Sequence, residues 1–210
     1  AVPTGTIRAD GSLVLRLYYD LETVTISFDP NGGTLPVSLS GGTKDFRYGQ
    51  AFSADAAEQA DYGFAGWYNG ETAFAAGTAV TAALTLTAHW TAGEVSYTVE
   101  HYVMNPDGSY AAAITDPRSG LVDSTLTLAE LKNAGYEVEG GIAYHHAVVA
   151  GETAETVSIT GGMTVKLYYD RIAHNLSWDF ADGEYTGSYT SGSVLYGAPI
   201  TAPVPTLLGY

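Results

Sequence analysis

Few residues in this chain have the types and spacing that metal binding or catalysis requires. His145 and His146 are adjacent, and imidazole nitrogens are common metal ligands. Neighbouring side chains on a strand point to opposite faces, so this pair is not expected to hold one ion together. We therefore expect a histidine pair at the surface or at a sheet edge, and no metal site. The other histidines each lie alone inside a strand pattern, and we expect structural roles for them: His89, His101 and His174.

Two short stretches superficially suggest calcium-binding loops. They are Asp29-Pro30-Asn31 and Asn105-Pro106-Asp107. A calcium loop of the EF-hand type needs Gly at its sixth position and a bidentate Glu at its twelfth, and neither stretch has them. Both stretches are therefore predicted to be turns.

Catalytic chemistry has little support in the sequence. Cysteine is absent, which removes thiolate nucleophiles, disulfides and cysteine-ligated zinc. No nucleophile elbow is present, and no nucleophile, base and orienting group can be assembled. We expect no enzymatic activity and no cofactor. The sequence leaves open an internal Lys–Asn isopeptide crosslink, for which the amine would come from Lys44, Lys132 or Lys166.

The charge of the chain restricts its partners. Lys and Arg number 8 against 23 Asp and Glu, which gives a formal net charge of −15. Such a chain repels nucleic-acid phosphates and anionic lipid headgroups. No apolar run is long enough to span a membrane, and no signal peptide opens the chain. We expect no nucleic-acid partner and no membrane insertion within this segment.

An internal repeat organises the sequence. Leu17-Tyr18-Tyr19-Asp20 occurs again 150 residues later as Leu167-Tyr168-Tyr169-Asp170. Ile26-Ser27-Phe28-Asp29 matches Leu176-Ser177-Trp178-Asp179 at the same spacing, and Tyr48-Gly49 matches Tyr196-Gly197 at a spacing of 148. Such a repeat is typical of chains built from small modules in series. We expect this chain to be a fragment that is cut within a repeat at both ends.

The repeat predicts four segments. Residues 1–20 should be the C-terminal strand of a truncated module, and 21–92 a complete first module. Residues 95–172 should be a different complete module, and 173–210 the N-terminal half of another copy of the first. Alternating apolar residues predict that Leu13–Tyr19 is a strand. Because its apolar face and backbone need partners, we expect it to pair with an adjacent module or a neighbouring chain, and the 173–210 segment likewise. The alternative is that the true modules are offset from these boundaries.

The first module resembles the Listeria–Bacteroides repeat, which is similar to the B-repeat of internalin-type surface proteins. The resemblance rests on four motifs in order: Thr25-Ile26-Ser27-Phe28-Asp29-Pro30-Asn31-Gly32-Gly33, Tyr48-Gly49, Tyr62-x-Phe64-Ala65-Gly66-Trp67-Tyr68 and Leu86-x-Ala88-His89-Trp90. One departure is Asp61-Tyr62, where the family usually has Gly-Tyr.

The second module resembles the mucin-binding-type (MucBP-like) repeats of bacterial surface proteins. Its motifs are Tyr97-Thr98-Val99-Glu100-His101-Tyr102, Gly135-Tyr136 and Lys166-Leu167-Tyr168-Tyr169-Asp170. Both resemblances imply small β-grasp-like modules in tandem, an α+β but mainly β fold with mixed sheets and at most one short helix each. The best helix candidate is 125–134, since Leu128 and Leu131 share a face and Gly135 follows.

The aromatic residues could serve packing or ligand binding. Tyr62, Phe64, Trp67 and Trp90 could form a platform on which sugars stack. Core packing is favoured, because a module of this size has few other large groups to bury. The predicted structural core comprises Phe28, Tyr62, Phe64, Trp67, Trp90, Leu167 and Tyr169.

Three tyrosines differ because they lie on outward faces of predicted strands. Tyr18, Tyr102 and Tyr168 are the weak candidates for contact with another module or a ligand. The leading hypothesis is a non-enzymatic repeat segment of a bacterial cell-surface protein, acting as an extended stalk or an adhesive region. Its partners would be neighbouring repeat modules, or a host or bacterial surface protein or glycan. The alternative is a carbohydrate- or mucin-binding module that uses the exposed tyrosines. The protein would be extracellular, with its signal and anchor outside this segment.

Overall fold

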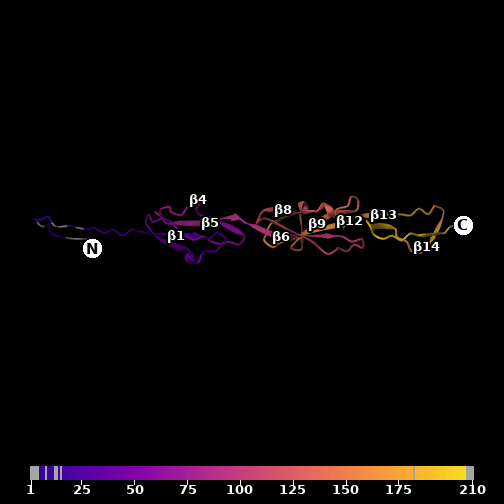
Figure 1. The fold of residues 1–210 in the computed structure, drawn as a ribbon, viewed down its shortest axis with the longest axis horizontal. Helices are drawn as coiled ribbons and strands as arrows, with labels where there is room; N and C mark the ends of the chain where they lie inside the picture. The colour runs from indigo at the N-terminus through magenta and orange to yellow at the C-terminus, as the bar shows by residue number, and fades with distance from the viewer. Residues whose placement is uncertain (1–4, 8, 12–13, 15, 182, 207–210) are drawn as a thin grey trace. The chain divides into compact units, whose positions relative to one another are not determined.

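The computed structural model describes residues 5–7, 9–11, 14, 16–181 and 183–206 (Figure 1). The chain divides into two compact units, residues 1–91 and 92–210. Each unit has its own five-stranded sheet. The mainly β class with mixed sheets, predicted from the sequence, is confirmed.

The first unit contains one mixed sheet. Its elements are β1 (Thr23–Asp29), the 3-10 turn η1 (Val37–Leu39), β2 (Thr43–Arg47), β3 (Tyr62–Asn69), β4 (Thr72–Ala73) and β5 (Leu84–Ala92). The strand order is β2-β1-β5-β3-β4, with β1 antiparallel to β2 and parallel to β5. Alternation along β1 buries Val24, Ile26 and Phe28 and turns the residues between them outward. These three residues belong to the core of the unit.

The turn after β1 is fixed by local chemistry. Asn31 and Gly32 have positive φ angles of 46° and 87°, and the Asn31 amide donates to the Asp29 carboxylate at 2.9 Å. The Asn31 side chain donates to the Ala88 carbonyl of β5 at 3.0 Å, and the Trp90 indole donates to the Asn31 carbonyl at 3.0 Å. The turn is thereby tied to the last strand of the sheet.

The second unit repeats the arrangement of the first. Its elements are β6 (Glu94–Val103), β7 (Ile114–Leu121), β8 (Thr125–Thr127), the 3-10 turns η2 (Leu128–Leu131) and η3 (Ala134–Tyr136), β9 (Ile142–Val149), β10 (Glu152–Ala154), β11 (Thr156–Ser158) and β12 (Thr164–Arg171). The main sheet has the order β10-β9-β12-β6-β7. β6 runs parallel to β12 and antiparallel to β7. A small separate sheet pairs β8 with β11.

Both sheets therefore follow one plan, in which the first and last strands of the module are parallel neighbours. The pairs are β1 with β5 and β6 with β12. Two parallel neighbours start at the same end of a sheet and finish at the other. Within each module the chain consequently enters at one end and leaves at the opposite end.

The predicted helix over 125–134 is wrong. Residues 125–127 form β8, which pairs with β11 through Leu126 and Val157, and two 3-10 turns follow. Leu128 and Leu131 are both buried, but a single 3-10 turn already places residues three apart on one side. The Asn133 side chain then accepts the Gly135 amide at 2.9 Å, which starts the next short turn instead of a longer helix.

The predicted paired strand at 13–19 is also wrong for the residues that the structure describes. Residues 16–22 belong to no strand, and Leu17 is 62% exposed. The repeat counterpart, β12, is paired on both sides by β6 and β9, which precede it in the chain. No described residues supply such neighbours to 16–19. Leu13 and Leu15 lie outside the described residues.

The C-terminal segment pairs with itself. Its strands are β13 (Ala173–Leu176), β14 (Glu184–Thr186), β15 (Gly192–Leu195) and β16 (Val204–Thr206). β13 pairs antiparallel with β15, and β14 with β16. The prediction that this segment pairs with an adjacent module or a neighbouring chain is therefore wrong for these strands. The pair β13/β15 repeats the β1/β2 pair of the first module, as the internal repeat requires.

Candidate functional site

The outer face of the second sheet carries a stack of aromatic rings. Tyr168 of β12 lies opposite Tyr102 of β6 and His146 of β9 in the strand register. The Tyr102 and Tyr168 rings are nearly parallel, with centroids 5.0 Å apart and an angle of 13°. His146 covers the other side of Tyr168 at 4.7 Å and 7°. We call these three residues the ring stack.

A β-bulge shapes the end of this stack. The register shifts between Tyr168 and Tyr169, which leaves His145 as an extra residue in β9. His145 and His146 therefore lie together, with their Nδ1 atoms 3.0 Å apart, and Nδ1 of His145 is 2.6 Å from the Asp170 carboxylate. The expectation that the two histidines point to opposite faces is wrong, because the bulge interrupts the strict alternation. No group of three or more His, Asp or Glu within the described ranges could hold a metal ion.

Two tyrosine hydroxyls near the stack donate to carboxylates. The Tyr110 hydroxyl donates to Asp170, and its ring packs edge-on against Tyr168 with centroids 4.9 Å apart. Burial, with the Asp170 carboxylate beside it, raises the pKa of Tyr110. The Tyr102 hydroxyl donates to Glu100 at 2.8 Å, and this hydrogen bond raises the pKa of Tyr102. Both hydroxyls stay protonated at neutral pH and act as donors.

An open groove of about 810 Å³ lies beside the stack. Glu100, Lys166 and Tyr168 contribute to its lining, together with hydroxyl-bearing residues of the segment around β11. Both faces of the Tyr168 ring are covered by Tyr102 and His146. A sugar that stacks on an aromatic ring needs an open face, so the Tyr168 ring offers a ligand in the groove only its edge.

The structure brings together two of the three outward-facing tyrosines. Tyr102 and Tyr168 stack on each other, and both are half-buried. Tyr18 lies in the first unit, in the unpaired segment before β1, and is 85% exposed. These three residues therefore do not form one site.

Four of the predicted core aromatics, Phe28, Phe64, Trp67 and Trp90, pack against one another in the first module. Phe28, Trp67, Leu167 and Tyr169 are buried, whereas Tyr62, Phe64 and Trp90 are half-buried. The Trp67 ring meets Phe28 edge-on at 4.8 Å and Phe64 at 5.4 Å, and its indole donates to the Asp55 carbonyl at 3.0 Å. Phe64 in turn meets Trp90 at 5.6 Å. These mutual contacts favour core packing over an open sugar platform.

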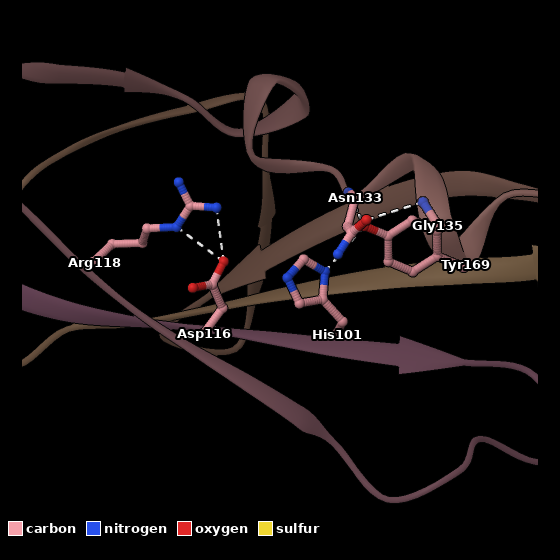
Figure 2. A network of polar contacts seen from close by, with 6 residues as sticks. All are labelled: His101, Asp116, Arg118, Asn133, Gly135 and Tyr169. Atoms are coloured by element: carbon pink, nitrogen blue, oxygen red, sulfur yellow. Dashed lines mark hydrogen bonds and ion pairs between the residues drawn. The ribbon is translucent and has the colours of Figure 1, made fainter.

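A buried polar network lies on the inner side of the second sheet (Figure 2). His101 is 1% exposed, and its Nδ1 lies 3.0 Å from the Tyr169 hydroxyl. That hydroxyl also accepts the Asn133 amide at 2.8 Å. Nearby on the edge strand β7, Arg118 bonds Asp116 through two nitrogens at 2.9 and 2.7 Å. The sequence predicted a structural role for His101 but not its partners, which come from a distant turn and strand.

These features define a class: small modules in series, each a mixed sheet with parallel first and last strands. Residues 25–89 match the family model of the Listeria–Bacteroides repeat domain, a domain of bacterial surface proteins. No curated protein matches the chain. The matched range includes most of β1, all of β2, β3 and β4, and most of β5. The resemblance of 95–172 to MucBP-like modules stays a prediction. No helix of the described residues is long and apolar enough to span a membrane.

Proposed function

We propose that this chain is a non-enzymatic segment of a bacterial cell-surface protein, in which modules in series form an extended stalk or an adhesive region. The observation that carries the proposal is the parallel pairing of the first and last strands in each module. Because the chain enters and leaves a module at opposite ends, every added module adds length. The eight residues of β12 alone rise about 26 Å.

Two further features support a structural role. Residues 25–89 match the Listeria–Bacteroides repeat domain, which is found in bacterial surface proteins, and this match supports the proposal. The net charge of −15 would keep such a segment soluble and disfavour its collapse onto anionic surfaces. Its partners would be neighbouring modules of the same protein, or a host or bacterial surface protein.

Small-angle X-ray scattering of the whole chain tests the stalk. A compact chain of this length has a radius of gyration of about 17 Å. The stalk predicts a value clearly above this figure, and a compact value would contradict it. The surface location is tested separately, by antibody labelling of intact cells of the bacterium that encodes the chain. Labelling that requires permeabilised cells would contradict that part of the proposal.

A second candidate function is glycan or mucin binding at the groove beside the ring stack. Glu100 supplies an acceptor there and Lys166 a donor, and both are suited to sugar hydroxyls. Glycan-array binding of the whole chain tests it, with Tyr102→Ala and Tyr168→Ala as variants. Tyr68→Ala is a matched control, since Tyr68 stacks on His89 in the first unit. Binding that survives both tyrosine substitutions, or no binding at all, would exclude this function.

A further inference from the structure

Where the second module ends, the chain passes directly into the next pair of strands. β12 ends at Arg171 and β13 begins at Ala173, so only Ile172 separates them. Several contacts tie the β13/β15 hairpin back onto the module. We call Arg171, Ile172, Gly141 and Tyr196 the Arg171 joint.

The Arg171 side chain bonds to both sides of the joint. Its Nε donates to the Met104 carbonyl, which follows β6, at 2.8 Å. Its Nη1 donates to the Tyr196 carbonyl, which follows β15, also at 2.8 Å. The guanidinium carbon lies 5.9 Å from the centre of the Tyr196 ring. A planar guanidinium can hold two carbonyls in a fixed geometry, which a lysine ammonium cannot do in the same way.

Tyr196 packs on a glycine of the module. A Cβ atom built on Gly141 would lie 2.8 Å from two atoms of the Tyr196 ring, closer than carbon atoms can approach. The Tyr196 ring therefore packs directly against the backbone of Gly141. Just before this position, the Gly140 carbonyl lies 2.8 Å from Nε2 of His174 in β13. Two side chains from the hairpin side, Tyr196 and His174, thus contact the Gly140–Gly141 pair.

Backbone hydrogen bonds complete the joint. The Ile172 amide donates to the Gly141 carbonyl at 2.8 Å, and the Tyr196 amide donates to the Ile172 carbonyl at 2.9 Å. The single connecting residue is therefore bonded to the module through its amide and to the hairpin through its carbonyl. Rotation about this residue would break both bonds.

We propose that the Arg171 joint fixes the orientation of the β13/β15 hairpin on the second module, so that the two do not swivel about their one-residue connection. Arg171 and the glycine pair of the module, together with His174 and Tyr196 from the hairpin side, form an interface specific to this order of segments. This role of the Arg171 joint does not depend on the function of the whole segment.

The internal repeat shows which part of the joint is particular to this junction. In the first module the Tyr48 amide donates to the Glu22 carbonyl at 2.8 Å, as Tyr196 does to Ile172. The residue that corresponds to Arg171, however, is Leu21, which is 57% exposed. The backbone pattern is repeated, whereas the guanidinium contacts are not. Arg171→Leu is therefore the substitution that the chain itself suggests.

Pulsed electron–electron double resonance, which measures the distance between two spin labels, tests the joint in the whole chain. The chain has no native cysteine, so spin labels attach only at introduced sites. One label pair spans the joint, at exposed positions of β7 (Thr115→Cys) and β15 (Ser193→Cys). A control pair, Thr115→Cys with Glu152→Cys, spans only the main sheet of the second module.

A fixed joint gives a narrow distance distribution across the junction in the otherwise unchanged chain. Arg171→Leu and Tyr196→Ala should each lose that narrow distribution, while the control pair stays narrow. Arg118→Leu is the matched control, because it removes an arginine of the same module that bonds Asp116. It should leave the distance across the joint unchanged.

Two results would overturn the proposal: a broad distribution across the joint in the unchanged chain, or a narrow one in both Arg171→Leu and Tyr196→Ala. If Arg171→Leu also broadens the distance distribution of the control pair, the substitution disturbs the sheet itself. The result for Tyr196→Ala then decides whether the joint fixes the hairpin. Tyr196 lies outside that sheet, so its removal tests the junction alone.

Discussion

The hydroxyl oxygen of Tyr169 lies 3.0 Å from Nδ1 of His101, and both side chains are buried. Nε2 of His101 is buried without a hydrogen-bond partner among the described residues. A second proton on this ring would place a charge in the core, where Nε2–H would have no acceptor in the described part of the chain. Burial therefore lowers the pKa of His101, with Arg118 acting in the same direction and Asp116 opposing it.

This arrangement predicts that acid destabilises the second module. Since the folded state resists protonation of His101, the unfolded state binds more protons once the pH falls below the ordinary histidine pKa of about 6.5. The free energy of unfolding should then fall by up to about 1.4 kcal/mol per pH unit until the lowered pKa is reached. Urea unfolding at several pH values, followed by NMR through the backbone amides of β12, measures how steeply the free energy of unfolding changes with pH. His101→Phe should reduce it, and an equal slope in both proteins would contradict the prediction.

Trp67→Ala should strongly destabilise the first module. Trp67 is 4% exposed and packs against Phe28 and Phe64. Truncation of a buried aromatic side chain costs about 3–5 kcal/mol. Denaturant unfolding measures the loss, with Tyr68→Ala as control, for which about 1 kcal/mol is expected from the lost stacking on His89. A loss for Trp67→Ala no larger than that of the control would mean that Trp67 is not part of the core.

Two glycines of the first module should differ sharply when changed to alanine. A Cβ on Gly33 would lie 2.5 Å from the Trp90 ring and 2.7 Å from the Glu58 carbonyl oxygen, whereas a Cβ on Gly41 meets nothing within 4 Å. Gly33→Ala should therefore cost roughly 1–3 kcal/mol through overpacking. Gly41→Ala should change the free energy of unfolding by less than about 0.5 kcal/mol. Thermal or urea unfolding of the two variants checks this, and similar losses in both would refute it.

The two tyrosines of the ring stack, Tyr102 and Tyr168, should be energetically coupled in the folded state. A double-mutant cycle with Tyr102→Ala and Tyr168→Ala should give a coupling energy of about 0.5–1.5 kcal/mol. Tyr144 contacts Tyr169 on the inner side of the sheet, with ring centroids 6.1 Å apart, so Tyr102→Ala and Tyr144→Ala serve as the control cycle. That pair should be additive within about 0.5 kcal/mol. Additivity in both cycles would show that the stacked geometry adds nothing beyond burial.

Much of the fold could be predicted from the sequence because alternation reports directly on burial. Val24, Ile26 and Phe28 indicated both a strand and its inward face, and the structure buries all three. Periodicity is a local property, and these features depend on local order alone.

The predictions that were wrong concern features that residues far away in the sequence determine. The leucines at 128 and 131 suit a helix, but pairing of β8 with β11 decides the local structure. The orientation of His145 depends on a register shift against β12, which no pattern within β9 reveals. The strand expected at 13–19 had the right alternation, yet it lacks neighbours in the described residues. In each case the deciding interaction is a tertiary contact.

The parallel pairing of β6 with β12 has a mechanical consequence. Six residue pairs, from Thr98 with Thr164 to Val103 with Tyr169, join the strands at which the chain enters and leaves the module. A force that pulls on the two ends of the module loads this ladder in shear, so its hydrogen bonds share the tension and must break together. A hairpin pulled from its open end would instead unzip one bond at a time. The same pairing that separates the ends of the module thus makes the module resistant to being pulled apart.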